Sequence, residues 1–249
     1  MKQRRPDLSI VIPAYCEEKR IGKTLDRLSS FLNNDKALKN KRIEVIVVSA
    51  DSPDKTHKII SEKAGLFKDF VFIKPGPKVG KGRDVQAGML KAKGKFVIFM
   101  DADLATPLSY LLIFLESINR GADLVVGARN LKKHHKSFIR RSVSRVGNSL
   151  FRIAGGISIE DSQCGFKMFT RRAAQICFKK MTIKKWGFDM ELLVIAKNEG
   201  LNITIQRIDD WQDVPNGSLN DVFRSSFYTL KDLLIIVINR IRGIYLVDD

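Results

Sequence analysis

The sequence has few cysteines and no long apolar run. Its 249 residues include three cysteines, Cys16, Cys164 and Cys177. Such an odd and sparse set argues against a disulfide framework and favours a reducing compartment. The longest strongly apolar runs are Phe96–Met100 and Leu233–Ile238. Both are far shorter than the roughly 18–20 apolar residues that cross a bilayer, so the sequence predicts no transmembrane helix.

Acidic residues are also scarce relative to basic ones. The chain has 44 Lys and Arg against 27 Asp and Glu, a formal net charge of +17. No acidic residue occurs between Leu124 and Ile159, a stretch that contains eight basic residues. These are Arg129, Lys132, Lys133, Lys136, Arg140, Arg141, Arg145 and Arg152. The excess predicts an anionic partner: nucleic acid, a phosphorylated substrate or an anionic membrane surface.

The composition, 44% hydrophobic and 29% charged, is that of a globular protein rather than a disordered chain. Apolar patterns of strand and helix type alternate through the first half. Strands are expected at Leu8–Ala14, Ile43–Val48, Phe70–Ile73, Phe96–Met100 and Leu124–Val126. Helices are expected at Arg20–Leu32, Lys55–Phe67, Gly80–Lys93 and Pro107–Asn119, the last with proline in its first turn. This alternation predicts an α/β fold with a mostly parallel central sheet flanked by helices, whose ligands bind at the carboxyl ends of the strands.

The C-terminal part has a different pattern. A linker near Val214–Ser218 precedes a stretch, Leu219–Tyr245, with apolar residues at helical spacing. We expect a catalytic domain over residues 1–215 and an amphipathic segment over residues 216–249. That segment either inserts into a membrane interface or packs on the core. The side chains available for insertion are Phe223, Phe227, Leu230, Leu234, Ile238 and Ile241.

Two short motifs carry candidate chemistry. Asp101-Ala102-Asp103 directly follows a predicted strand, and its two carboxylates suit Mg²⁺ or Mn²⁺. A turn with two capping aspartates is the alternative. Gly80-Lys81-Gly82-Arg83 opens a predicted helix, where glycine permits close backbone approach and the helix N-terminus attracts anions. It has the spacing of neither a P-loop nor a dinucleotide fingerprint.

These motifs occur in a recognisable order along the chain. Ser9–Glu18, Gly80-Lys81-Gly82 and Phe99–Pro107 together resemble the family 2 inverting glycosyltransferases, which have the GT-A nucleotide-sugar fold. Three downstream motifs extend the resemblance to dolichyl-phosphate β-glucosyltransferases and bacterial polyprenyl-phosphate relatives. They are Val126–Arg129, Asp161–Lys167 and Trp186–Glu191.

The resemblance implies a donor site for a nucleoside-diphosphate sugar. It places four residues near the base and ribose, namely Pro13, Ala14, Tyr15 and Glu17. It makes Asp101 and Asp103 the metal ligands, with Ala102 between them in the donor site and Lys81 beside the diphosphate. The implied cofactor is Mg²⁺ or Mn²⁺.

Two departures from the family pattern bear on the substrate. Where such enzymes usually have Asp-Asp-Gly-Ser, this chain has Ser49-Ala50-Asp51-Ser52, so either Asp51 contacts the base from a shifted position or base recognition differs. Some lipid-phosphate mannosyltransferases have a glutamine metal ligand at the position of Ala105. Alanine matches the glucosyltransferase pattern instead.

The resemblance also implies an acceptor site. Arg129 matches the arginine that binds the acceptor phosphate, and Arg141 and Arg145 are candidates for a second one. Asp161 matches an acid at the reaction centre. Three further residues, Trp186, Asp189 and Glu191, are candidate contacts to the sugar or acceptor, although helical spacing would let at most one of the two acids face the site.

The sequence thus predicts inverting transfer of a hexose, with UDP-glucose as the expected donor, to a polyprenyl phosphate. We expect a cytoplasmic enzyme attached peripherally to the cytoplasmic face of a membrane, with no nucleic-acid partner. The alternatives are a GDP-mannose-dependent enzyme, a soluble acceptor, an inactive scaffold and, outside the enzymes, a basic nucleic-acid-binding module.

Overall fold

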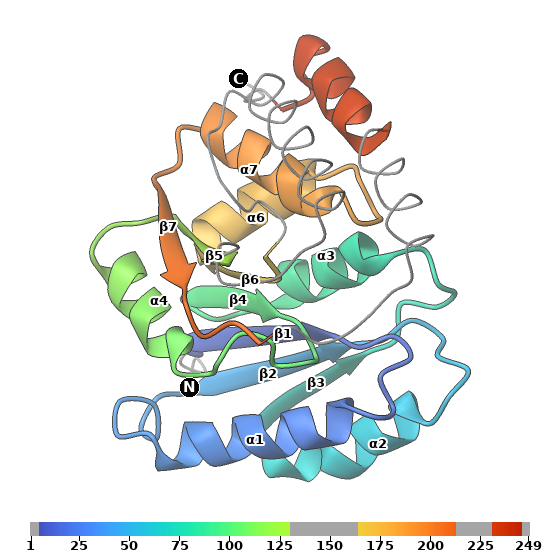
Figure 1. Ribbon diagram of the computed structural model, residues 1–249, viewed down its shortest axis with the longest axis vertical. Helices are drawn as coiled ribbons and strands as arrows, with labels where there is room; N and C mark the ends of the chain where they lie inside the picture. Colours follow the sequence, from blue (N-terminus) through green and yellow to red (C-terminus); the bar gives the residue numbers. More distant parts are fainter. Residues whose placement is uncertain (1–4, 130–163, 213–230, 246–249) are drawn as a thin grey trace.

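A seven-stranded sheet forms the centre of the computed structural model (Figure 1), which describes residues 5–129, 164–212 and 231–245. The strand order is β3-β2-β1-β4-β6-β5-β7. The strands are β1 (Leu8–Pro13), β2 (Ile43–Val48), β3 (Asp69–Ile73), β4 (Phe96–Met100), β5 (Leu124–Arg129), β6 (Phe166–Thr170) and β7 (Ile203–Ile208). Only β6 runs antiparallel to its neighbours, β4 and β5. The expected α/β fold with a mostly parallel sheet is therefore confirmed.

Helices cover both faces of this sheet. The helices are α1 (Ile21–Asn34), α2 (Thr56–Lys63), the short 3₁₀ helix η1 (Ala64–Leu66), α3 (Lys81–Lys91), α4 (Tyr110–Asn119), α6 (Arg171–Lys180) and α7 (Phe188–Asn198). One face packs against α1, α2 and α4, and the other against α3, α6 and α7. Two separate cores result, because alternate residues of each strand point to opposite faces.

The buried strands explain the continuous apolar runs of the sequence. Every residue of β4 is buried, as is every residue of β1 except Pro13. Strands covered by helices on both faces need apolar side chains on both, so their sequences lack the alternation of a half-exposed strand.

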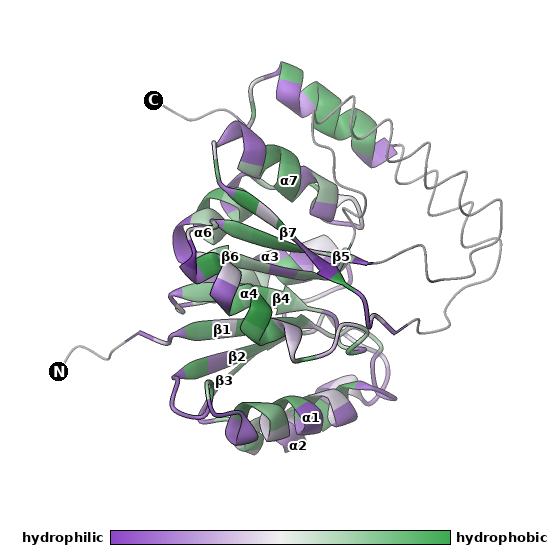
Figure 2. Ribbon diagram, turned by 60° about the vertical axis from the view of Figure 1, so that its left-hand side comes forward, coloured by the Kyte–Doolittle hydropathy of each residue, from purple (hydrophilic) through white to green (hydrophobic). Residues whose placement is uncertain are grey.

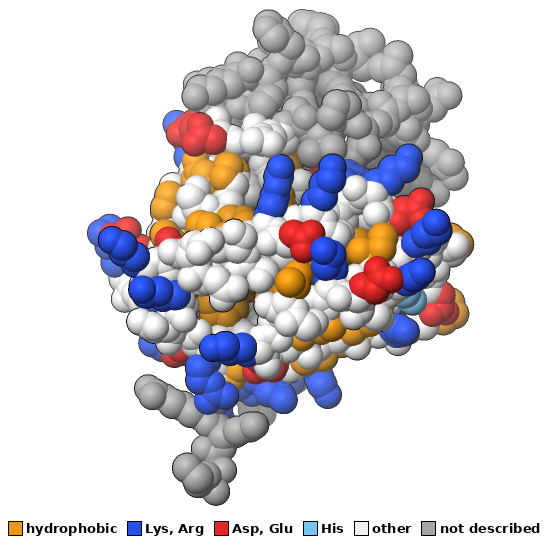
Figure 3. Space-filling model, turned by 90° about the horizontal axis from the view of Figure 1, so that it is seen from below, with side chains coloured by type: hydrophobic (Ala, Val, Ile, Leu, Met, Phe, Trp, Pro, Cys, Tyr) orange, Lys and Arg blue, Asp and Glu red, His pale blue; other side chains and the backbone are white. Residues whose placement is uncertain are grey.

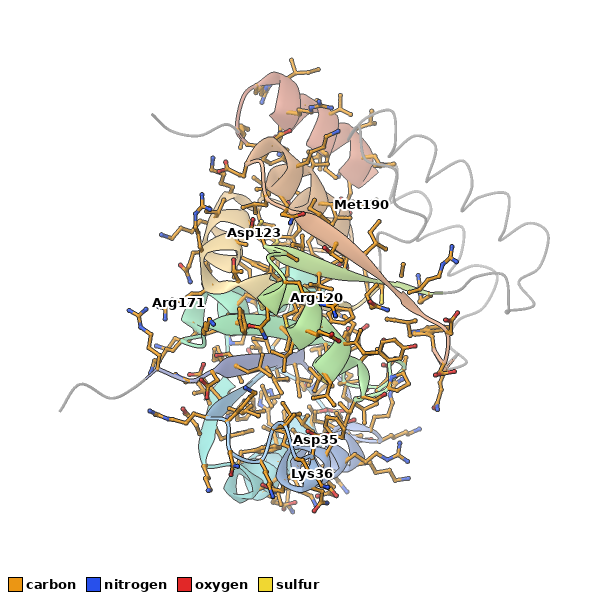
Figure 4. The ribbon with its side chains drawn as sticks, turned by 90° about the vertical axis from the view of Figure 1, so that its left-hand side faces the viewer. Asp35, Lys36, Arg120, Asp123, Arg171 and Met190 are labelled. Atoms are coloured by element: carbon orange, nitrogen blue, oxygen red, sulfur yellow. The ribbon has the colours of Figure 1, made fainter. Side chains whose placement is uncertain are left out.

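The parallel arrangement brings many loops to one edge of the sheet. Pro13 lies opposite Val48, and Val48 lies opposite Ile73. At the same edge β6 begins, with Phe166 opposite Met100, and β5 and β7 end together, with Arg129 opposite Ile208. Asp123 and Arg171, which flank the other ends of β5 and β6, lie at the opposite side of the sheet in Figure 4. The first edge therefore gathers the loops that carry the candidate site residues.

Some predicted boundaries are wrong. The helix expected at Pro107–Asn119 begins at Tyr110, because Pro107 and the next two residues form a turn in which the Tyr110 amide donates to the Pro107 carbonyl. The fifth strand extends to Arg129 instead of ending at Val126, so Arg129 is the last residue of a strand rather than a loop residue. The helix expected at Lys55–Phe67 ends at Lys63 and continues as η1.

Residues 231–241 are helical and are followed by a turn to Tyr245. This C-terminal helix lies beside α7 in Figure 1, and Leu233, Ile236 and Tyr245 are buried in the core that contains α7. Apolar and hydrophilic residues both occur along this helix, as the green and purple colours of Figure 2 show, and some of its apolar side chains are exposed. The exposed ones are Leu234, Ile238 and Ile241, with Ile241 81% exposed. We call these three residues the outer stripe.

Candidate active site

An ion pair between Lys81 and Asp101 lies at the carboxyl edge of the sheet. Lys81 begins α3, and Asp101 directly follows β4. The Lys81 ammonium lies 2.5 Å from Asp101 Oδ1. Burial alone would lower the pKa of Lys81, but the negative charges of Asp101 and Asp189 outweigh burial and raise it. Lys81 is therefore a firmly protonated cation, as a ligand for phosphate must be.

The amides at the start of α3 bind protein rather than leaving a phosphate cradle. The Gly82 amide donates to the Lys185 carbonyl at 3.1 Å, and the Arg83 amide donates to the Lys184 carbonyl at 3.0 Å. A Cβ on Gly82 would lie 2.9 Å from the Ile183 and Lys185 carbonyl oxygens, so glycine lets this loop approach the helix. The expectation that the helix N-terminus itself attracts the anion is wrong for these two amides, and the Lys81 side chain is the cationic group left for that role.

Gly165 lies against one side of the Asp101 carboxylate. The Asp101 amide donates to the Gly165 carbonyl at 3.2 Å, and a Cβ on Gly165 would overlap the Asp101 carboxylate. The Asp101 side chain is nevertheless 37% exposed. Its carboxylate thus rests on bare backbone on one side and remains accessible on the other.

Asp103 lies in a tight turn. Its Oδ1 accepts a hydrogen bond from the Ala105 amide at 3.0 Å, and Leu104 between them has a φ of +54°. Cys16, in the loop after β1, has a φ of +56°. Among the described residues these are the only non-glycine residues with positive φ, and both lie in loops at the site edge. Such strained positions cluster at functional sites.

Asp101 and Asp103 fit a divalent metal that keeps other ligands. No group of three or more metal-ligating side chains occurs among the described residues. Mg²⁺ and Mn²⁺ need only one or two protein carboxylates when substrate phosphates and waters supply the remaining oxygens. The accessible Asp101 carboxylate and the neighbouring Asp103 form a donor set of that kind.

A pocket opens beside these aspartates. Its walls are Met100, Asp101, Asp103, Leu104, Ala105, Thr106, Gly165, Phe166 and Trp211. The Arg129 guanidinium lies over the Trp211 ring, 5.1 Å from its centroid. The Gln212 amide donates to the Ala105 carbonyl at 2.8 Å, which ties the segment after β7 to the turn after β4. Two acids and Trp211 therefore line one pocket, and Arg129 contacts the Trp211 ring.

The predicted base and ribose residues follow β1 and β2. Ala14 is buried, and its amide donates to the Val48 carbonyl at 2.9 Å, which joins the loop after β1 to β2 beside the half-buried Pro13. Tyr15 is half-buried, with the Lys78 ammonium 4.2 Å from its ring centroid, and Asp51 is exposed. The structure therefore brings these residues to the same edge as Asp101.

Glu17 lies near the two aspartates. Burial raises the pKa of Glu17, Arg20 opposes this effect, and the charges of Asp103 and Asp101 add to it. The Glu17 carboxylate pairs with Arg20 at 2.7 Å. Glu17 thus contributes negative charge near Asp101 and Asp103 while being held by its own arginine.

The Trp186–Glu191 motif divides between the site and the interior. Trp186 is 65% exposed, and the Lys81 ammonium lies 5.6 Å from its ring centroid. Asp189 is buried and pairs with Lys167 at 2.5 Å. Glu191 is fully buried and accepts from the Thr182 amide and hydroxyl, the Ile183 amide and the Tyr245 hydroxyl. Both acids lie on α7, as the predicted helix requires, and Glu191 holds protein groups rather than facing the pocket.

Three predicted residues, Asp161, Arg141 and Arg145, lie outside the described residues. Others were missed from the sequence. No site role was expected for Trp211, whose predicted role is packing; the structure packs it partly against the core and also places it in the pocket wall. Ile203–Ile208 forms β7, but its isoleucines at 203, 205 and 208 do not keep strict alternation, so the pattern gives only a weak strand signal. Lys167 was missed because nothing in a sequence marks a lysine as buried.

Comparison with known proteins agrees with this geometry. Residues 9–177 match the model of the family described as glycosyl transferase family 2. The chain belongs to that family and is a glycosyltransferase.

Several similar proteins share the name dolichyl-phosphate beta-glucosyltransferase. A dolichyl-phosphate beta-glucosyltransferase of Trichomonas vaginalis is 33% identical over 85% of this chain and 68% of its own length. Those of Drosophila melanogaster and Saccharomyces cerevisiae are each 34% identical, over 95% and 96% of this chain and 76% of their own lengths. The chain thus resembles dolichyl-phosphate beta-glucosyltransferases over most of its length.

Solved structures share the GT-A-like fold. Mannosyl-3-phosphoglycerate synthase from Rubrobacter xylanophilus matches with a TM-score of 0.71 at 18% identity, over 98% of this chain and 77% of that one. Glucosyl-3-phosphoglycerate synthase from Mycobacterium tuberculosis, in complex with Mn²⁺, UDP-glucose and phosphoglyceric acid, matches with a TM-score of 0.68 at 18% identity, over 93% and 80%. These likenesses confirm the predicted fold class.

Proposed function

We propose that the protein transfers a hexose, with inversion, from a nucleoside-diphosphate sugar to a polyprenyl phosphate. UDP-glucose is the proposed donor. The observation that carries the proposal is the placement of the Lys81–Asp101 pair and the Arg129–Trp211 pair on the carboxyl edge of one sheet, with the pocket beside Asp101. The names of the relatives support the sugar and the lipid acceptor.

On the donor side, the residues provide charge rather than a nucleophile. Lys81 is a protonated ammonium that can bind the diphosphate and stabilise the charge on the departing nucleoside diphosphate. Asp101 and Asp103 would hold Mg²⁺ or Mn²⁺, and a bound divalent ion supplies charge neutralisation of the leaving group. The loop residues Tyr15, Glu17 and Asp51 would lie around the base and ribose of the nucleotide.

On the acceptor side, a lipid phosphate is already an anion, so it needs placement more than a general base. Arg129 would bind that phosphate through its planar guanidinium, which suits two parallel contacts. Asp161, Arg141 and Arg145 remain proposed partners in this region. Trp186 is a proposed wall of the sugar site, because it is exposed beside Lys81.

The outer stripe supports a lipid acceptor over a soluble one. No helix among the described residues is long and apolar enough to span a bilayer. The C-terminal helix nevertheless exposes the outer stripe while its inner side packs on the core. Lys231, Arg240 and Arg242 of the same segment are also exposed. An apolar stripe with flanking cations suits an anionic membrane surface, which we propose is the cytoplasmic face.

A donor panel tests the proposal. The purified full chain would be incubated with Mn²⁺ or Mg²⁺, a short polyprenyl phosphate and, in separate reactions, UDP-glucose, UDP-galactose, GDP-mannose and UDP-N-acetylglucosamine. We expect a glycolipid from UDP-glucose and none after chelation of the metal or with Asp103→Asn. Asp26→Asn, which alters a surface pair with Lys63, is the matched control and should retain activity. Glycolipid from GDP-mannose alone would contradict the donor assignment.

A further inference from the structure

A second ion pair lies behind the site, in the interior. The Lys167 ammonium is 2.5 Å from Asp189 Oδ1, and the two side chains are 0% and 5% exposed. Lys167 belongs to β6 in the middle of the sheet, opposite Phe99 of β4 and Val126 of β5. A charged pair in such a position is weak evidence for stability, because its desolvation opposes its attraction and an apolar pair of similar size often serves as well.

Lys167 is connected to Asp101 through the backbone. Besides pairing with Asp189, its ammonium donates to the Cys164 carbonyl at 2.6 Å. Cys164 precedes Gly165, the residue that accepts from the Asp101 amide and against which the Asp101 carboxylate rests. The Lys167 ammonium thus holds the backbone just before β6, and this backbone contacts Asp101.

Asp189 is connected to Lys81 through charge. The charge of Asp189 raises the pKa of Lys81, and the charge of Lys81 opposes the rise that burial causes in the pKa of Asp189. Lys81 in turn pairs with Asp101. The four groups therefore alternate in sign from the interior to the surface, in the order Lys167, Asp189, Lys81, Asp101.

We propose that Lys167 and Asp189 are positioning residues of the donor site, which fix Asp101 and Lys81 without touching the substrate. Asp189 divides the attraction of Lys81 between itself and Asp101, so that Asp101 is not fully neutralised by the lysine. Burial raises the pKa of Asp189 and the charge of Lys167 opposes that rise, while the Lys167 ammonium also keeps the Cys164–Gly165 backbone in place. This inference rests on the proposed roles of Lys81 and Asp101 at the donor.

The test is a paired substitution in the full chain. Lys167→Met/Asp189→Leu removes both charges and keeps apolar volume, so we expect a folded protein with a melting temperature near that of the parent. Binding of UDP with Mn²⁺, measured by calorimetry, should weaken about 10- to 100-fold, as is typical when partners of metal ligands are lost. The Mn²⁺ concentration for half-maximal transfer should rise, while KM for the lipid phosphate stays within about twofold of that of the parent.

Lys180→Met/Glu199→Leu is the matched control. This pair, 2.6 Å apart and mostly buried, joins α6 to the far end of α7 from Asp189. About ten residues of helix, or roughly 15 Å, separate Glu199 from Asp189. The control should bind UDP and Mn²⁺ as the parent does.

The donor and metal affinities of the variants decide whether Lys167 and Asp189 position the site. Parental UDP and Mn²⁺ affinity in the folded Lys167→Met/Asp189→Leu variant would overturn the positioning role. If that variant does not fold, Asp189→Asn decides, because its amide oxygen can still accept from Lys167 and keep the fold. Unchanged donor and metal affinity in Asp189→Asn would likewise overturn the role. A parent protein that binds no nucleotide would instead refute the proposed function, and this inference with it.

Discussion

At the scale of single residues, the site depends on how closely Asp101 approaches backbone. Gly165 is the one residue that lets the carboxylate lie against the start of β6, since any Cβ there would overlap it. Asp101 must therefore move if Gly165 gains a side chain, and with it the Lys81 ammonium 2.5 Å away. Backbone without a side chain is thus as necessary to the site as the charged groups.

Gly165→Ala should reduce transfer at least about 100-fold, because misplacement of about 1 Å at a reacting centre has an effect of that size. Gly65→Ala is the control, since a Cβ at Gly65 would meet no atom within 4 Å. Initial rates and circular dichroism of both variants check this. A folded Gly165→Ala enzyme with parental rates would show that transfer does not depend on the present position of the Asp101 carboxylate.

Arg129→Ala should weaken use of the lipid phosphate more than use of the donor. Loss of a charge-assisted contact to phosphate should raise the activation free energy by about 1.5–3 kcal/mol, seen in kcat/KM for the acceptor. Arg120→Ala, which removes an exposed pair with Glu116, is the control. If the donor constants change and the acceptor constants do not, Arg129 does not bind the acceptor.

At the scale of elements, the C-terminal segment is hydrogen-bonded to residues around the loop before α7, and the carbonyls of that loop accept from the α3 amides. Asp232 accepts from the Gly187 amide at 2.9 Å, and the Tyr245 hydroxyl donates to Glu191 at 2.7 Å. Glu191 also binds Thr182 and Ile183, at the start of the loop whose carbonyls bind the α3 amides. A continuous set of hydrogen bonds therefore runs from the C-terminal helix to the element that begins with Lys81.

Tyr245→Phe should lower the free energy of unfolding by about 1–2 kcal/mol, because it removes a buried hydrogen bond to a carboxylate that keeps its other donors. Urea unfolding measures the loss, and hydrogen exchange should show faster exchange in residues 231–245. Ser117→Ala, which removes an exposed hydroxyl bond to the Ile113 carbonyl, should change stability by less than about 0.5 kcal/mol. Equal stability of Tyr245→Phe and the parent would mean that the Tyr245–Glu191 hydrogen bond does not stabilise the fold.

The elements also show what the sequence could predict. Strands β1, β2 and β4 are apolar except for Ser9 and Glu44 and were predicted to within one or two residues, since burial on both faces leaves a strong signal. The motif Asp101-Ala102-Asp103 was placed at the end of β4 for the same reason. By contrast, the pairing of β6 between β4 and β5 depends on contacts distant in sequence. The Lys167–Asp189 pair joins β6 to α7, and the Arg129–Trp211 pair depends on the pairing of β5 with β7. Both join residues distant in sequence, so local patterns could not predict them.

At the scale of the whole molecule, the positive charge of the described residues is dispersed on one face. On the face seen in Figure 3, lysine and arginine side chains are spread over the surface, with acidic side chains between them, rather than gathered into one patch. A net charge of +17 then acts on an anionic surface as a general attraction that salt weakens. Apolar contact must supply the rest of any membrane attachment.

We therefore expect the protein to bind anionic vesicles more strongly than neutral ones, and less strongly at high salt. Leu234→Gln/Ile238→Gln/Ile241→Gln, confined to the outer stripe, should reduce co-sedimentation with vesicles and transfer to lipid while leaving UDP binding intact. Ile113→Gln/Ile205→Gln, which changes two exposed residues elsewhere, is the control. Unchanged vesicle binding by the triple variant would show that the stripe does not contact lipid.

The central claim is inverting transfer to a lipid phosphate, and the anomeric configuration of the product tests it most directly. The purified chain, Mn²⁺, UDP-glucose and a short polyprenyl phosphate would be incubated together, and the glycolipid examined by NMR and mass spectrometry. We expect a β-linked glucosyl phosphate, formed from the α-linked donor. An α-linked product, or glucose transferred only to water or a soluble acceptor while the lipid phosphate remains unmodified, would contradict it.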